Sequence, residues 1–172
     1  MHLDMTVEQR QSRLVGANGH RTSYTPQIFV SGVDVPGWGG SAEAEIRRIG
    51  AQPATARLTL RATLAQAGVL AIDVEATARQ STPALYLALT EDGLVSAVAA
   101  GENRGATLRH DYVVRRLLGP LPLSGGKLAE HVTVPLDPAW RLDRLGAAAF
   151  VEDTASGRVL QALSTSPCSL GR

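Results

Sequence analysis

The feature that most constrains this chain is a change of hydrophobic period after Pro53. From Ala56 to Leu64 every second residue is apolar, and the same alternation returns from Leu70 to Ala76. A period of two places apolar side chains on one face of a strand and polar ones on the other. With the short connection at 66–68 between them, the two runs predict an antiparallel hairpin with one buried face.

Further short apolar runs follow along the chain, separated by turn signals such as Glu91-Asp92-Gly93 and Ser156-Gly157. They predict strands at 85–89, 94–99, 108–118, 128–134, 147–151 and 158–163. A series of about seven short strands with turns between them indicates an all-β sandwich.

The first 52 residues contain two segments with helical patterns and one short apolar run between them. Thr6 to Val15 predicts a short helix, and Ser41 to Ile49 predicts a second one with Ser41 as its N-cap. Between them, a segment from Thr22 ends in the apolar run 28–30, which predicts a buried strand. This segment buries too little surface to stand alone, so it must pack on the sandwich, on another chain or on further residues.

These patterns together predict the fold class and the boundary between two units. We expect an α+β chain that is mostly β. Residues 1–52 form a strand-loop-helix unit, and residues 53–172 form an antiparallel β-sandwich of about seven strands.

The composition excludes several classes of protein. Lys and Arg number 17 against 16 Asp and Glu, so the chain lacks the basic excess of an electrostatic nucleic-acid binder. No apolar run approaches the roughly 18 residues of a membrane span. Cys168 is the one cysteine, which excludes a disulfide framework and a cysteine-rich zinc site within the chain. Residues 1–13 are polar and carry no export signal, which predicts a cytoplasmic protein if the chain is the complete product.

Two glycine-rich loops are candidate binding sites. Gly101, Glu102, Asn103, Arg104 and Gly105 form either a binding loop that presents a carboxylate, an amide and a guanidinium, or a turn whose polar residues cap their own backbone. Trp38 lies in the other loop, where it either contacts a protein or glycan or covers the end of the sandwich.

The remaining polar clusters predict no metal site and no cofactor. His110 and Asp111 are adjacent in a strand and point to opposite faces, so they do not easily share a metal. His110 and Tyr112 share a face that His131 could join. Asp73 and Glu75 fit solvated charges on the polar face of a strand. The sequence carries no Ser-His-Asp set, phosphate loop or zinc spacing, and we predict no catalytic residue.

Several stretches of the sequence carry a family resemblance. They are the lead-in Glu8-Gln9-Arg10-Gln11, the segment YTPQIFV at 24–30, the helix start Gly40-Ser41, the turn GENRG at 101–105 with Leu108, and Val113-Val114-Arg115. In this order they resemble the family catalogued as domain of unknown function 1223, secreted thioredoxin-like bacterial proteins.

The resemblance implies a fold and a site for the front segment. It implies that 1–52 is the end of a thioredoxin-like domain, that the Thr25–Pro26 bond is cis, and that Tyr24, Thr25, Pro26 and Gln27 contact a substrate or partner. It also implies a secreted or periplasmic location. Members of the family carry a Cys-x-x-Cys in a front half that this sequence lacks.

Two functions follow from these observations. In the first, the chain is a thioredoxin-like protein without redox activity, because Cys168 alone cannot both attack and resolve a disulfide. In the second, it is a non-enzymatic sandwich that binds a protein or glycan. We also expect the apolar run 28–30, with an unpaired strand edge, to favour a homo-oligomer through the front segment.

Overall fold

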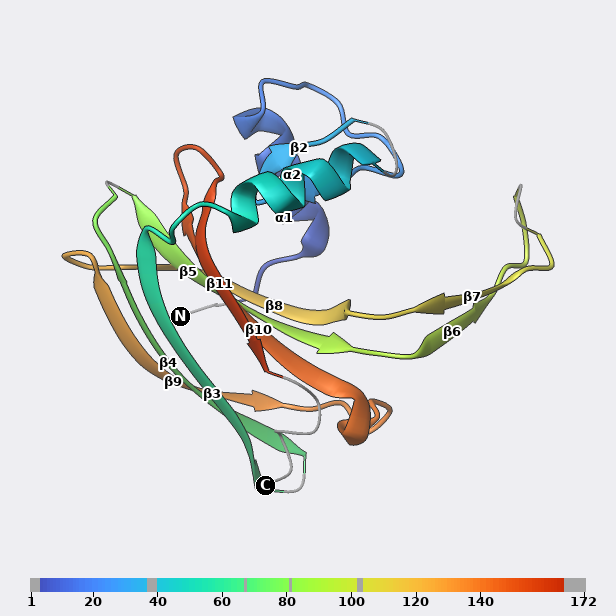
Figure 1. Ribbon diagram of the computed structural model, residues 1–172. Coiled ribbons are helices and arrows are strands. Elements are labelled where there is room, and N and C mark those ends of the chain that lie inside the picture. Colours follow the sequence, from blue (N-terminus) through green and yellow to red (C-terminus); the bar gives the residue numbers. More distant parts are fainter. Residues whose placement is uncertain (1–3, 37–39, 67, 81, 102–103, 166–172) are drawn as a thin grey trace.

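The computed structural model describes residues 4–36, 40–66, 68–80, 82–101 and 104–165 (Figure 1). Its elements in chain order are α1 (Val7–Ala17), β1 (Phe29–Val30), β2 (Val33–Asp34), α2 (Gly40–Gly50), β3 (Ala56–Gln66), β4 (Val69–Ala78), β5 (Pro83–Glu91), β6 (Leu94–Ala97), β7 (Thr107–His110), β8 (Val113–Pro122), β9 (Lys127–Pro135), the short 3-10 helix η1 (Leu142–Arg144), β10 (Leu145–Asp153) and β11 (Val159–Thr165).

Two antiparallel sheets make up the body of the molecule. One has the strand order β3-β4-β9, and the other has the order β11-β10-β5-β8. Apolar side chains from both sheets form one core, which includes Leu70 and Ile72 of β4, Leu85 and Leu87 of β5, and Val151 of β10. The mostly β sandwich predicted from the sequence is therefore confirmed, with seven strands in its two main sheets.

The first predicted hairpin, β3 with β4, is also confirmed. Leu60 lies opposite Val74 and Ala62 lies opposite Ile72, so the alternating apolar residues of both strands share the inner face. The outer face of the same pair carries Arg61 opposite Asp73. One buried and one wet face is what a period of two predicts.

Strand β5 differs because it is buried on both faces. Leu85, Leu87 and Leu89 point into the core between the sheets, whereas Ala84 and Tyr86 belong to a second cluster on the outer face. Met5 and Phe150 pack against this second cluster. The outer face of the four-stranded sheet is thus covered by the front segment.

Helix α1 begins with a complete capping box. The Thr6 hydroxyl accepts a hydrogen bond from the Gln9 backbone N–H, and the Gln9 side chain accepts one from the Thr6 N–H. Both bonds satisfy backbone donors that a helix start leaves without a partner. Leu14 and Val15 are the buried residues of the helix.

The strand predicted at the end of Thr22–Val30 is shorter and more exposed than expected. Only Phe29 and Val30 are in a strand, which pairs with β2 to form a two-residue hairpin and is half-buried. The prediction of a buried strand is wrong, because β1 lies beside β2 on the surface of the molecule rather than within a larger sheet.

The second predicted helix is present, but it begins one residue earlier than expected. Helix α2 starts at Gly40, so Ser41 lies within its first turn and does not occupy the N-cap position. Glu43 still lies in the first turn, and Arg47 and Arg48 lie in the last turn, as suits the helix dipole. The connection from α2 to β3 crosses the boundary predicted after Gln52, and the division into two domains there stays a prediction.

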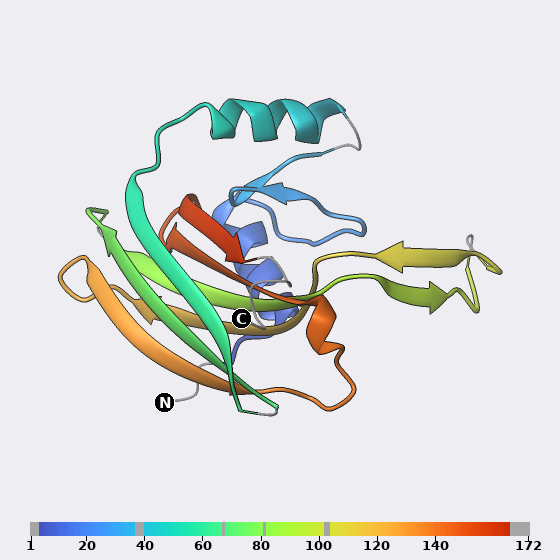
Figure 2. The same cartoon turned by 60° about the horizontal axis from the view of Figure 1, so that its bottom comes forward.

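The long strand predicted over 108–118 is two strands with a break at Asp111-Tyr112. Tyr112 has a φ of 55°, a conformation that ends regular strand geometry. β7 pairs with β6 instead, and the two form a ribbon that extends away from the body (Figures 1 and 2). Among the described residues, no helix has the length and apolar character needed to cross a membrane.

Candidate functional site

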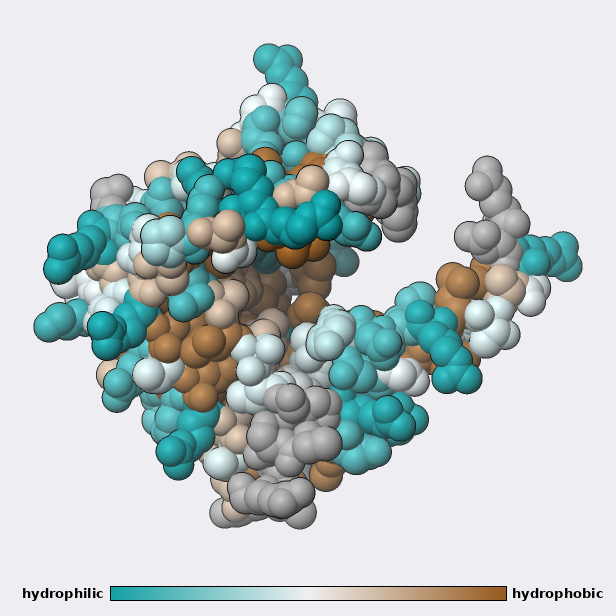
Figure 3. Space-filling view, in the orientation of Figure 1, coloured by the Kyte–Doolittle hydropathy of each residue, from teal (hydrophilic) through white to brown (hydrophobic). Residues whose placement is uncertain are grey.

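An open groove of about 1350 Å³ lies between helix α2 and the four-stranded sheet. We call it the α2 groove; its apolar lining includes Phe29, Ile46, Ile49, Phe150, Val159 and Leu160. The space-filling view shows a hollow beneath the polar outer surface of α2, with apolar surface inside it (Figure 3).

Helix α2 forms one wall of this groove and buries almost nothing in doing so. None of its residues is buried, and Ile46 is 58% exposed. Ile46 and Ile49, three residues apart on one face, both line the groove. The apolar stripe of the helix therefore faces open space, although the helix is amphipathic as a packed helix would be.

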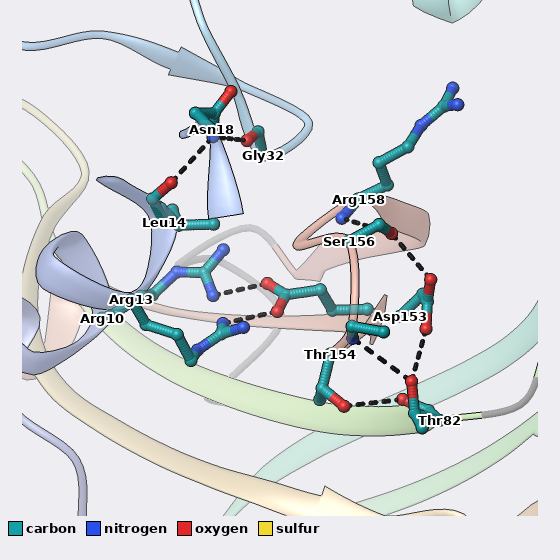
Figure 4. Close-up of polar contacts among 12 residues, drawn as sticks. Arg10, Arg13, Leu14, Asn18, Gly32, Thr82, Asp153, Thr154, Ser156 and Arg158 are labelled. Carbon is teal, nitrogen blue, oxygen red and sulfur yellow. Dashed lines mark hydrogen bonds and ion pairs between the residues drawn. The ribbon is translucent and has the colours of Figure 1, made fainter. Parts of the chain in front are cut away.

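The hairpin β1–β2 stands beside the groove because Asn18 fastens it to α1. The Asn18 Nδ2 donates to the Leu14 and Gly32 carbonyls, each at 2.8 Å, and its Oδ1 accepts from the Asp34 N–H (Figure 4). Two of these three bonds join the end of α1 to the hairpin, and they fix the relative position of the two elements. Asn18 is a positioning residue for this wall of the groove.

The hairpin also lies directly against the turn between β10 and β11. Gly32 has a φ of 84°, and a Cβ added to it would stand 1.8 Å from the Gly157 carbonyl oxygen. Only glycine fits such a close backbone approach. The Ser31 hydroxyl donates to the Val159 carbonyl, and the Val159 N–H donates to the Ser31 carbonyl. The front segment is thereby held to the sandwich by backbone contacts.

Below the groove, α1 is clamped to the sheet by a buried ion pair. Glu152 on β10 is fully buried; Arg10 Nη1 lies 2.6 Å from its Oε2, and Arg13 contacts its Oε1. The Arg10 guanidinium stacks over Phe150 at 4.6 Å, and Phe150 in turn stacks on Tyr86. Burial raises the pKa of Tyr86. The two arginines point from α1 towards the sheet in Figure 4.

The polar lining of the groove is rich in side-chain amides. Of the seven glutamines in the chain, five line it: Gln11, Gln27, Gln52, Gln80 and Gln161. A glutamine amide both donates and accepts, as does a peptide group. The Gln161 Oε1 accepts the N–H of Ala162, a residue on the edge strand β11. The groove is therefore lined by groups that suit an uncharged polar chain.

Three charged residues line the groove, and two of them have partners. Arg10 is paired with Glu152, and Asp153 accepts hydrogen bonds from Thr82 and Ser156, which hold its pKa below the usual value. Arg158 points away from this hydrogen-bonded turn (Figure 4). Its charge contributes to lowering the pKa of Glu45 on α2, whose hydrogen bond to Arg48 has the larger effect.

Of the predicted contact residues Tyr24 to Gln27, Gln27 alone is among the residues that line the groove. The Thr25–Pro26 bond is cis, and Tyr24, Thr25 and Pro26 are exposed. Gln27 lines the groove, and its Nε2 donates to Asp34 at 2.9 Å. The Tyr24 hydroxyl donates to the same carboxylate, which raises the pKa of Tyr24.

The predicted loop 101–105 is not part of the groove. Gly101, Arg104 and Gly105 lie at the tip of the β6–β7 ribbon, at the far end of an extension from the body (Figure 2). Glu102, Asn103, Trp38 and Cys168 lie outside the described residues. The structure therefore separates the two candidate sites that the sequence suggested.

The histidines have separate partners. His131 lies 2.7 Å from Asp73 across the β4–β9 pair, whereas His110 lies 3.1 Å from Ser96 on β6. Asp111 does not project from a strand face but accepts the N–H of Gly93. The part of the chain that the structure describes contains no cluster of three metal-ligating side chains.

Two features of this site were missed by sequence reasoning. Arg10, Arg13 and Leu14 share one face of α1, a spacing that could have indicated a packed helix. Glu152, the partner of Arg10 and Arg13, lies far along the chain and has the sequence pattern of an ordinary strand residue. The gathering of glutamines from five separate segments has no signal in the sequence.

Comparison with known proteins identifies the family. Residues 4–152 match the family described as "Protein of unknown function (DUF1223)", and the chain belongs to that family. A search of curated proteins finds no match to this chain.

Two solved structures share the fold. HBP35 of Porphyromonas gingivalis is similar with a TM-score of 0.69 and 16% identity over 95% of this chain and 58% of that one. Protein AGR_C_4864 from Agrobacterium tumefaciens is similar with a TM-score of 0.55 and 17% identity over 94% of this chain and 71% of that one. This chain thus spans little more than half the length of HBP35.

Proposed function

We propose that this chain is a non-enzymatic binding module that holds an extended polypeptide segment in the α2 groove, one in which apolar and uncharged polar residues alternate and which carries a single acidic residue. The observation that carries the proposal is the amphipathic helix α2, which presents the exposed Ile46 and the half-buried Ile49 to the groove above an apolar floor. An amphipathic element gains stability by covering its apolar stripe, and a bound segment supplies that cover.

The polar lining favours a polypeptide over a lipid chain. Glutamine amides donate and accept in the same way as backbone N–H and C=O groups, which a hydrocarbon chain lacks. Within the lining, Gln11 Nε2 donates to Gln27 Oε1, and each of these amides keeps further bonding capacity that a polypeptide backbone can use. Arg158 supplies a cation for one acidic residue of the bound segment.

The test is a binding titration with a defined peptide. The probe is an acetylated, fluorescently labelled peptide of alternating valine and asparagine that ends in one glutamate. We expect saturable binding to the full chain, and Ile46→Lys should weaken it by at least about tenfold, since burying an isoleucine is worth roughly 1.5–3 kcal/mol. Leu142→Lys is the matched control, because Leu142 is 43% exposed and does not line the groove.

Two outcomes contradict the proposal. One is the absence of saturable binding up to about 1 mM, the weakest affinity that a site of this kind should show. The other is equal loss of affinity in Ile46→Lys and Leu142→Lys, which would mean that the peptide does not occupy the groove.

We also propose that the chain is thioredoxin-like in its front segment but has no dithiol activity. The order of a proline loop, the hairpin β1–β2 and helix α2 supports the first part, and the single cysteine of the sequence supports the second. The family resemblance further supports a location outside the cytoplasm. The purified chain should not accelerate insulin reduction by dithiothreitol, and turnover that persists in Cys168→Ser would contradict this.

A further inference from the structure

The β6–β7 ribbon has two strand edges of different character. Residues 94–100, which form β6 and its continuation, carry no charge, no proline and no glycine. The opposite strand segment carries Arg104, Arg109, His110 and Asp111. Proteins protect exposed strand edges with charged residues, and an uncharged run of this length is the kind that pairs with other chains. Charged residues therefore protect the β7 edge from pairing with another chain, whereas the β6 edge has no such residues.

The edge of β6 has no neighbour within the described chain. β5 pairs with β10 as far as Leu145 opposite Glu91, and the chain before Leu145 turns away as the short helix η1. Beyond that point, β6 pairs with β7 alone, and Figures 1 and 2 show the ribbon standing clear of the body. Val95 is 58% exposed, and Ser96 and Ala97 are exposed as well.

Hydrogen bonds at the base of the β6–β7 ribbon hold the ribbon in a defined direction. The Asp111 carboxylate accepts the Gly93 N–H at 2.8 Å, and the Asp92 carboxylate accepts the Tyr112 N–H at 2.7 Å. Arg141 Nη2 also donates to the Asp92 carbonyl at 3.1 Å. The first two bonds tie the bases of the two strands to each other, and the third ties the β6 side to the segment that precedes η1.

We propose that β6 is a dimerisation strand that pairs antiparallel with β6 of a second copy of this chain. A two-stranded ribbon alone is marginally stable in water, whereas the four-stranded ribbon β7-β6-β6-β7 of such a dimer has the strand number that a stable sheet needs. Antiparallel pairing about a two-fold axis at Ser96, between the exposed Val95 and Ala97, places Ser96 opposite its own equivalent and Val95 opposite Ala97, so that uncharged residues meet across the seam.

The charges of the ribbon favour a second copy as the occupant. In the dimer, Arg109 of each copy lies on the outer strand, and two uncharged strands separate it from its equivalent. Like charges directly opposite each other would destabilise the pair, and this arrangement avoids them. The β6 strand carries no charged side chain with which a different protein could form a selective ion pair, so the edge offers little selectivity for such a partner.

Sedimentation equilibrium of the full chain tests the proposal. We expect a reversible dimer, and the double variant Val95→Lys, Ala97→Lys should raise its dissociation constant by at least about a hundredfold, since each lysine places a charge in the seam. Thr107→Lys is the matched control, because Thr107 lies opposite Ala97 on the outer strand and should change the constant by less than about threefold. Circular dichroism checks that each variant is folded.

A second measurement does not depend on charge. Ser96→Cys in a Cys168→Ser background should form an intermolecular disulfide on mild oxidation, whereas Thr107→Cys in the same background should not. The proposal is overturned if the chain is monomeric up to about 1 mM. It is also overturned if the dimer survives the β6 lysines but dissociates in Ile46→Lys, which would place the interface on the front segment.

Discussion

The two helices of this chain have the same length but opposite relations to the sandwich. Each spans 11 residues. Helix α1 buries Leu14 and Val15 and sends two arginines to the buried Glu152, whereas α2 buries none of its residues. The comparison shows that a segment can form a helix without packing closely against the rest of the molecule. Helix α1 packs on the sandwich, whereas α2 lines the α2 groove without burying any of its residues.

The largest expected effect comes from removing the carboxylate that clamps α1. Glu152→Ala leaves Arg10 and Arg13 without their partner, and breaking a buried pair in this way costs about 3 kcal/mol. Urea unfolding measures the change in free energy. The matched variant on α2 is Glu43→Ala, which removes an exposed ion pair with Arg47 and should cost less than about 0.5 kcal/mol. Equal losses in both variants would remove the distinction between the helices.

The next comparison concerns one apolar side chain on each helix. Leu14→Ala creates a cavity where Leu14 packs close to Gly157, and we expect a loss of about 3 kcal/mol in unfolding free energy. Ile46→Ala should change stability by less than about 0.5 kcal/mol, because Ile46 is exposed in the absence of a ligand. A loss above about 1.5 kcal/mol for Ile46→Ala would show that α2 is packed after all.

The start of α1 provides a smaller effect. Thr6→Ala removes the acceptor of the Gln9 N–H and should cost about 1 kcal/mol, while Thr6→Ser keeps the hydroxyl and should cost much less. Thermal unfolding followed by circular dichroism compares the two variants. If alanine and serine behave alike, the capping box does not contribute to holding α1.

The smallest effect concerns pH and the floor of the α2 groove. The Asp153 pKa is lowered by hydrogen bonds from Ser156 and Thr82, so its contribution to stability is present above the unfolded-state pKa of about 3.9. That contribution is lost as the pH falls through the lower folded-state pKa. Ser156→Ala should therefore reduce the loss of stability between pH 5 and pH 2, roughly the range in which an aspartate titrates. An unchanged pH profile would exclude this role for Ser156.

Much of the sandwich could be predicted from the sequence because its strands obey a local rule. The alternation from Ala56 to Leu64 and from Leu70 to Ala76 defines both the hairpin and its buried face. The double burial of β5 and the break at Tyr112 depend on what packs against or pairs with them. Local periodicity carries no information about such contacts.

The candidate site could be predicted only in part. The family resemblance implies that Gln27 contacts a substrate or partner; Gln27 lines the groove, and its role in binding stays a prediction. The groove itself joins α1, β1, α2 and β11, which lie far apart in the sequence. The clamp of Arg10 on Glu152 joins residues 142 positions apart. No spacing rule connects residues at such separations, and only the fold brings them together.

Hydrogen exchange of the two helices tests the central claim most directly, namely that α2 is an uncovered wall of a polypeptide-binding groove. In the full chain alone, we expect the α2 amides to exchange at least about tenfold faster than those of α1. Saturation with the valine-asparagine peptide should slow exchange in α2 and leave α1 unchanged. Protection of α2 equal to that of α1 without peptide, or no change in α2 when the peptide is bound, would contradict the account.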